Sequence, residues 1–96
     1  MSYKIRVVYT KPNAEVAMYT PEANFTNLID TYFTAGKITE KPVEVVDGLN
    51  YTYTMTFDSE VSKTEFYLED IFEENTESRS TYCSNNSITL SLENDI

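Results

Sequence analysis

The sequence predicts an α+β fold in which a four-stranded antiparallel sheet carries two helices on one face. In four short segments, apolar side chains alternate with polar ones, which is the pattern of half-buried strands. In two longer segments they recur every three or four residues, as on an amphipathic helix. The chain has 96 residues, which suits a single domain spanning residues 1–96. In order, the expected elements cover residues 3–10, 21–35, 42–46, 49–57, 62–85 and 87–93.

The first expected strand has a clear period of two. Every second residue from Tyr3 to Tyr9 is apolar, and most of them are β-branched or aromatic. Pro12 then fits a turn, but residues 13–19 follow no single period. They can continue as extended chain or as a short hairpin arm, and the pattern leaves both open.

The first expected helix is the most regular element. Thr20 can cap it, Pro21 suits its first position, and Gly36 can end it in a left-handed conformation. An apolar stripe at positions i, i+3, i+4, i+7 and i+8 runs along one side. It consists of Phe25, Leu28, Ile29, Tyr32 and Phe33.

The turn at Asp47–Gly48 predicts a hairpin between the two middle strands. A two-residue loop there would turn Val43 and Val45 toward the threonine side of the next strand. A three-residue loop, which pairs Val46 with Asn50, would place them beside its tyrosines instead. We favour the three-residue loop because it keeps apolar side chains together.

The second helix and last strand complete the order β-α-β-β-α-β. Ser62 and Glu65 match a capping box, and Asn85 or Asn86 can end the helix in a left-handed conformation. This order is that of the ferredoxin-like fold, which places the first and third strands in the middle of the sheet. The strand that starts at Pro42 then lies at an edge, where proline is tolerated.

The two faces of the predicted sheet differ in polarity. One face is apolar and packs under the helices, whereas the other carries small hydroxyl groups with scattered valine and arginine. Such a surface suits contact with a second sheet, so we expect a homodimer, although a solvated face in a monomer is the alternative. The expected dimer face consists of Arg6, Val8, Thr52, Thr54 and Thr56.

The chain resembles the dimeric α+β barrel superfamily, which includes proteins similar to antibiotic-biosynthesis monooxygenases and EthD. The resemblance lies in the element order and in the segments KIRVVYTKP, TAGKI and VVDGLNYTYTMTFDS. It implies two subunits packed sheet against sheet, with a pocket between the helices and sheet of each. Enzymes of these families use His, Trp and Asn groups there. Because this chain has no His and no Trp, we assign no catalytic residue and no cofactor and lean against an enzyme.

The expected pocket is rich in tyrosine. Tyr side chains combine an apolar body with one hydroxyl, which suits a small apolar or aromatic molecule. The same residues can equally be ordinary core, and both interpretations stay open. The expected lining comprises Tyr9 and Tyr53 from the sheet and Tyr32 from the first helix, with Phe33 and Met55 nearby.

Composition excludes several other functions. The single Cys83 forms no internal disulfide, and without His the chain offers neither a zinc site nor the commonest acid/base group. The clustered acids in the segment LEDIFEENTE indicate a solvated helix face rather than a metal site. No apolar run approaches the length of a membrane helix, and we expect a soluble cytoplasmic protein without a membrane partner.

The charge is concentrated in the second half of the chain. The net charge is −9, and residues 51–96 carry ten acidic and two basic groups. Nucleic acid is therefore not an expected partner, because it is bound by clustered Lys and Arg. An alternative function follows from the same charge, namely an acidic interaction module that occupies a basic surface of a partner, as phage-type mimics do.

Overall fold

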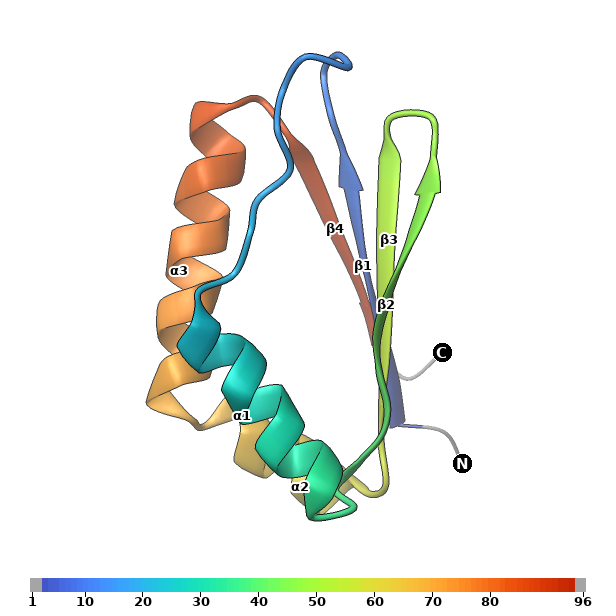
Figure 1. Cartoon of the computed structure of the whole chain (residues 1–96), viewed down its shortest axis with the longest axis vertical. Helices are drawn as coiled ribbons and strands as arrows, with labels where there is room; N and C mark the ends of the chain where they lie inside the picture. The colour runs from blue at the N-terminus through green and yellow to red at the C-terminus, as the bar shows by residue number, and fades with distance from the viewer. Residues whose placement is uncertain (1–2, 95–96) are drawn as a thin grey trace.

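The chain folds as a sheet with all of its helices on one side. The computed structural model describes residues 3–94. Figure 1 shows the antiparallel sheet edge-on, in the order β2-β3-β1-β4, beside the helices. The predicted α+β fold, with the first and third strands central, is confirmed, but there are three helices rather than two. The elements are β1 (Tyr3–Thr10), α1 (Ala23–Thr34), β2 (Ile38–Asp47), β3 (Asn50–Phe57), α2 (Glu60–Tyr67), α3 (Asp70–Asn85) and β4 (Thr89–Asn94).

Helix α1 begins later than predicted and ends where predicted. Its N-cap is Glu22, whose side chain makes no capping hydrogen bond, so the predicted cap at Thr20 is wrong. At the other end Gly36 has a φ of +78°. The Gly36 amide donates to the Phe33 carbonyl at 3.0 Å, and the Lys37 amide donates to the Tyr32 carbonyl at 2.9 Å. These two bonds form a Schellman motif, which explains the need for glycine.

The hairpin between β2 and β3 has a two-residue loop, Gly48–Leu49, closed by the pair Asp47 and Asn50. The favoured three-residue loop is therefore wrong, because Val46 pairs with Tyr51 and not with Asn50, and Val43 and Val45 lie on the threonine side as the two-residue alternative had it. Gly48 has a φ of +61° at the first loop position, where a type II′ turn needs glycine.

This register turns two valines of β2 away from the helices. Val43 pairs with Thr54 and Val45 pairs with Thr52. Their side chains remain 66% and 59% exposed, so the expectation that they lie beside the tyrosines is wrong.

Strand β2 lies at the edge of the sheet, as predicted, but starts at Ile38 rather than at Pro42. Its pairing with β3 shifts register between Glu40 and Val43, so Pro42 falls in an irregular part of the strand. A proline at such a point leaves no ladder hydrogen bond unmade.

The predicted second helix is broken into α2 and α3 at Leu68 and Glu69. Ser59, not Ser62, caps α2, and its hydroxyl accepts a hydrogen bond from the Ser62 amide at 3.2 Å. Glu69 has an extended backbone with a ψ of 134°, and its carboxylate accepts a hydrogen bond from the Tyr32 hydroxyl at 2.9 Å. The break follows Phe66, whose side chain is 0% exposed.

The end of α3 also differs from the prediction. Asn85 is the last helical residue and Asn86 has a negative φ, whereas Ser87 takes the left-handed conformation with a φ of 57°. The Ile88 amide then donates to the Cys83 carbonyl at 2.9 Å, which fixes the entry into β4.

The core consists of two clusters on the helix side of the sheet. Phe66 lies in the middle of the first cluster, with ring centroids of Tyr32 and Phe72 at 5.1 and 5.3 Å. The second cluster lies nearer the other end of the sheet and contains Tyr9, Cys83 and Ile88. The buried residues of the first cluster are Ile5, Leu28, Ile29, Tyr32, Ile38, Met55, Phe57 and Phe66.

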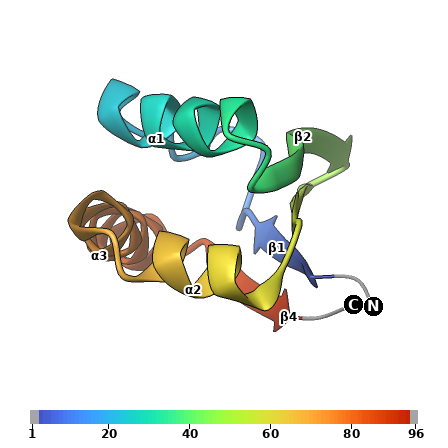
Figure 2. The same ribbon diagram turned by 90° about the horizontal axis from the view of Figure 1, so that it is seen from below.

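Among residues 3–94 the opposite side of the sheet carries no helix, as Figure 2 shows from below. We call this surface the open face. One row of paired residues across it runs Val45, Thr52, Val8 and Ser91. The next row runs Val43, Thr54, Arg6 and Glu93, and Arg6 and Glu93 form an ion pair of 3.1 Å. Thr56 lies in a third row, between Lys4 and Glu40.

Candidate ligand-binding cavity

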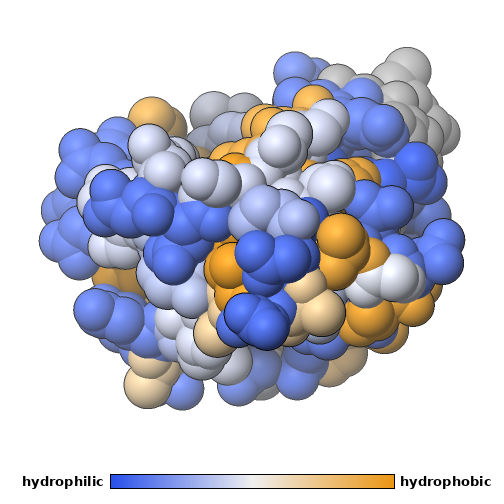
Figure 3. All heavy atoms as spheres, turned by 90° about the horizontal axis from the view of Figure 1, so that it is seen from above, coloured by the Kyte–Doolittle hydropathy of each residue, from blue (hydrophilic) through white to orange (hydrophobic). Residues whose placement is uncertain are grey.

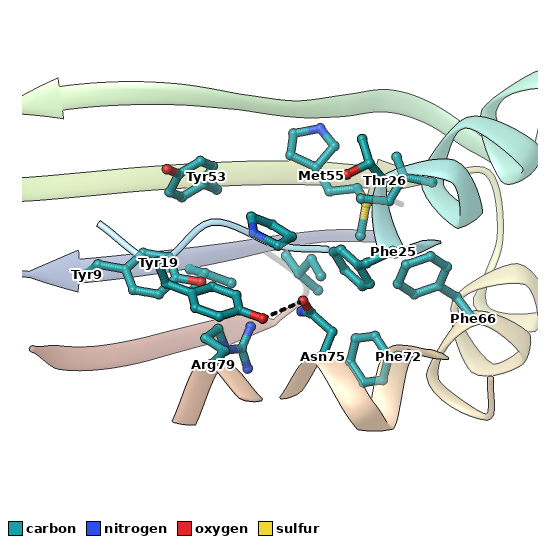
Figure 4. A pocket seen from close by; sticks show the side chains of 15 residues that line it. Tyr9, Tyr19, Phe25, Thr26, Tyr53, Met55, Phe66, Phe72, Asn75 and Arg79 are labelled. Carbon is teal, nitrogen blue, oxygen red and sulfur yellow. Dashed lines mark hydrogen bonds between the residues drawn. The ribbon is translucent and has the colours of Figure 1, made fainter. Parts of the chain in front are cut away.

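A cavity of about 340 Å³ lies between the two core clusters. Figure 4 shows its lining, which comes from β1, β2 and β3 of the sheet, from α1, α2 and α3, and from the segment that joins β1 to α1. The lining is mostly aromatic or aliphatic. It comprises Ile5, Val7, Tyr9, Tyr19, Pro21, Phe25, Thr26, Ile29, Pro42, Tyr53, Met55, Phe66, Phe72, Asn75 and Arg79.

The cavity exists because α3 presents polar residues toward the sheet. Phe72, Asn75 and Arg79 are spaced three and four residues apart, so they lie on one side of the helix. Only Phe72 belongs to the aromatic packing around Phe66. Asn75 and Arg79 occupy positions that face the sheet, where apolar residues are usual. At these positions α3 does not fill the space over β1 and β3.

Four polar side chains, those of Tyr9, Tyr19, Asn75 and Arg79, meet at one end of the cavity (Figure 4). The Tyr19 hydroxyl donates to Asn75 Oδ1 at 3.2 Å. Burial raises the pKa of the Tyr9 hydroxyl, and the Arg79 guanidinium beside it opposes that rise through its charge and a hydrogen bond. Within residues 3–94, Arg79 Nε is buried and has no hydrogen-bond partner.

Three of the five predicted lining residues border the cavity, and two do not. Tyr9, Tyr53 and Met55 line it from the sheet. Tyr32 is instead buried in the first cluster, where burial and the Glu69 carboxylate raise its pKa to about 12. Phe33 lies on the outer side of α1, 43% exposed, with the Lys41 ammonium 4.7 Å from its ring centroid.

The tyrosines of the sheet side act as neutral hydrogen-bonding groups. The Tyr53 hydroxyl donates to Glu44 Oε2 at 2.7 Å, and burial, followed by that carboxylate, raises its pKa. Its ring meets the Tyr9 ring edge-on, with centroids 5.5 Å apart. A tyrosine whose pKa is raised keeps its proton at neutral pH, so it donates hydrogen bonds rather than acting as a base.

Within residues 3–94 we find no set of groups arranged for covalent or metal chemistry. Cys83 is buried in the second cluster, and burial raises the pKa of its thiol despite the nearby Arg79. In that part of the chain, no His, Cys, Asp and Glu side chains gather as a metal site would require.

The lining residues that sequence reasoning missed include Tyr19, Asn75 and Arg79, three of the four whose polar groups meet at one end of the cavity. Tyr19 lies in a segment without a regular period, so its direction could not be inferred. The other two lie on the weak continuation of an apolar stripe along the second helical region. Polar residues at such inward positions are the signal that could have indicated a site there.

Comparison with known proteins leaves the chain without a family. No protein family matches it, and no curated protein does. Among solved structures it is similar to a conserved protein from Methanosarcina mazei Go1, with a TM-score of 0.47 and 16% sequence identity over 98% of this chain and 94% of that one. We transfer no ligand, activity or assembly from this similarity. In the described part of the chain, no helix is long and apolar enough to cross a membrane.

Proposed function

We propose that this protein binds a small, largely apolar molecule in the cavity between its helices and its sheet. The observation that carries the proposal is the cavity of about 340 Å³ with an apolar lining and a few polar groups at one end. Ligand pockets typically combine these two features, with volumes of roughly 300–1,000 Å³. A well-packed domain of this size has no structural use for such a space.

The volume limits the size of the ligand. A dry cavity of about 150 Å³ in another protein holds one benzene ring. A cavity of about 340 Å³ therefore suits a molecule of roughly two fused rings, or an aliphatic chain of similar volume. The rings of Phe25, Phe66 and Phe72 border the cavity, and aromatic rings pack favourably against an aromatic ligand.

We also propose that two copies join through their open faces, as in the dimeric α+β barrel superfamily. The open face carries Val43 and Val45 with most of their surface exposed, beside Val8 and three threonines. Figure 3 shows apolar side chains on the sheet side of the molecule, whereas the helix side is mostly hydrophilic. Val43 and Val45 follow each other on the same face of β2, and neighbouring valines on a threonine-rich sheet suit packing against a second sheet.

Binding of the uncharged two-ring dye 1-naphthylamine tests the cavity, because its fluorescence emission shifts in apolar surroundings. The wild-type protein is expected to bind one dye molecule per chain. Thr26 lies on α1 with an exposed side chain and borders the cavity. Thr26→Phe places a ring in the cavity from the helix surface and should weaken binding by about tenfold or more, since it removes much of the volume.

Thr31→Phe is the matched control. Thr31 also lies exposed on α1, and like Thr26 its hydroxyl donates to the carbonyl four residues earlier. Thr31 does not border the cavity. If both variants bind the dye as wild type does, or if wild type binds none, the cavity is not a binding site.

The acidic interaction module remains the second candidate, because the carboxylates of α3 are exposed on the helix side. Glu73, Glu74 and Glu77 all lie exposed there. Affinity for a basic protein should fall steeply with salt if this surface is used, and no such dependence should appear if the charge serves solubility alone.

A further inference from the structure

We propose that the ligand of this cavity is a monoanion, an aromatic or short aliphatic carboxylate whose carboxyl group lies against Arg79. The proposal rests on the proposed function and narrows it to a chemical class. Arg79 is the only charged residue of the cavity lining in the described part of the chain. Its guanidinium reaches from α3 toward Tyr9 and Tyr19, away from the aromatic end at Phe66 (Figure 4).

Arg79 lacks the counter-ion that most other basic side chains have. Ion pairs of 2.9–3.9 Å hold Lys4, Arg6, Lys37 and Lys41. Arg79 forms none with any carboxylate of residues 3–94, although the chain has 16 Asp and Glu residues. In so acidic a chain, an arginine kept apart from carboxylates at an apolar cavity is available to an anion from outside.

The hydrogen-bonding groups around Arg79 also favour a carboxylate ligand. Its Nε is a buried donor without an acceptor among the described residues, which is rare in folded proteins. Asn75 uses its Oδ1 to accept from Tyr19, and its Nδ2 donates to no described residue. A carboxylate supplies acceptor oxygens that match both the guanidinium and the amide.

The charge balance favours a carboxylate over a phosphate. A planar carboxylate carries one negative charge and fits a guanidinium through two hydrogen bonds. A phosphate near neutral pH carries closer to two charges, and one arginine in an apolar lining leaves the second uncompensated. Tyr9, whose pKa is raised by burial, stays protonated and donates to the anion rather than repelling it.

The net charge of −9 makes the test sharp, because the protein as a whole repels anions. We would compare 2-naphthoate with its uncharged analogue 2-naphthamide by isothermal titration calorimetry. These probes share the same two rings, so a difference between them reports the charged group. Wild type is expected to bind 2-naphthoate at least about tenfold more tightly, because hydrogen bonds to an ionised group are the strong ones.

Arg79→Met keeps an unbranched side chain of about the length of the arginine stem and removes the guanidinium with its charge. We expect this variant to lose the preference for 2-naphthoate while still binding 2-naphthamide within about twofold of wild type. Arg6→Met is the matched control, since it removes one positive charge on the open face, where Arg6 pairs with Glu93 at 3.1 Å. Arg6→Met should keep the full preference for 2-naphthoate over 2-naphthamide, and Arg79→Lys should keep part of it.

The outcomes separate this proposal from the proposed function. If 2-naphthamide binds wild type as tightly as 2-naphthoate, the cavity binds apolar molecules without selecting anions, and the proposal is overturned. If Arg79→Met keeps the preference, another group recognises the anion, which also overturns it. If neither probe binds, the proposed function itself is wrong. The comparison of the two probes on wild type needs no variant. It therefore shows whether the cavity selects a carboxylate even if Arg79→Met does not fold.

Discussion

Replacing Val45 by lysine should separate the proposed dimer into monomers. Val45 lies on the open face beside Thr52, and it is 59% exposed in the single subunit. Lysine at this position places an ammonium group against the partner sheet, where it cannot keep its hydration.

The size of the effect follows from the exposed fraction. Burying a whole valine side chain stabilises by roughly 1.5–3 kcal/mol. With 59% of Val45 left to cover, each copy contributes about 1–2 kcal/mol to the interface. A symmetric dimer contains two copies, so the loss is about 2–4 kcal/mol, or roughly 30-fold to almost 1,000-fold in the dimer dissociation constant.

Sedimentation velocity over a range of protein concentrations measures this shift, and the chain offers a closely matched control. Val46 is the next residue of β2, is 51% exposed, and pairs with Tyr51 on the helix side of the sheet. Val46→Lys changes the net charge equally and should leave the dimer intact. Equal dissociation in both variants, or a monomeric wild type at micromolar concentration, would refute the dimer.

Two further predictions concern stability. Phe66→Ala should lower the free energy of unfolding by about 3–5 kcal/mol in urea denaturation, because the ring is 0% exposed. Phe33→Ala should lower it by less than about 1 kcal/mol, because Phe33 is 43% exposed. Similar losses in the two variants would show that Phe66 is not the centre of the core. The stability of wild type should fall between pH 10 and pH 12, because the folded state raises the pKa of Tyr32 from 10.0 to about 12 and keeps a proton that the unfolded chain releases. This contribution is complete below pH 10 and is lost as the pH rises through 12, so Tyr32→Phe should show a shallower fall, and an equal fall in both proteins would contradict the assignment.

The elements that could be predicted are those whose sequence period is unambiguous. The stripe from Phe25 to Phe33 and the glycine at position 36 identified α1, and the alternation along β3 identified its two faces. The hairpin register could not be inferred in the same way, because the valines of β2 fit either face. The turn determines the register of the hairpin, because Gly48 adopts a positive φ as the first of two loop residues.

The break between α2 and α3 has no local cause in the sequence. Residues 62–85 contain neither Gly nor Pro, so their pattern predicts one continuous helix. The break depends on tertiary contacts, namely the burial of Phe66 among rings of the first core cluster and the hydrogen bond from Tyr32 to Glu69. Such contacts override helix propensity, which is weak for each residue.

The candidate site could be predicted on the sheet but not on the helices. A strand has a period of two, so Tyr9, Tyr53 and Met55 had to share a face. The apolar stripe of a helix is wider than one face of a strand, and its pattern does not show which edge of the stripe meets the sheet. The sequence therefore predicts Tyr32 and Phe33 at the cavity, although neither borders it.

The most direct test of the central claim is a crystal structure of the protein with 2-naphthoate. The account predicts the two rings between α1, α3 and the sheet, beside Phe25 and Met55, with the carboxylate within hydrogen-bonding distance of Arg79. A structure in which Tyr19 and Phe72 fill this space themselves, with the probe absent or bound elsewhere, would contradict it.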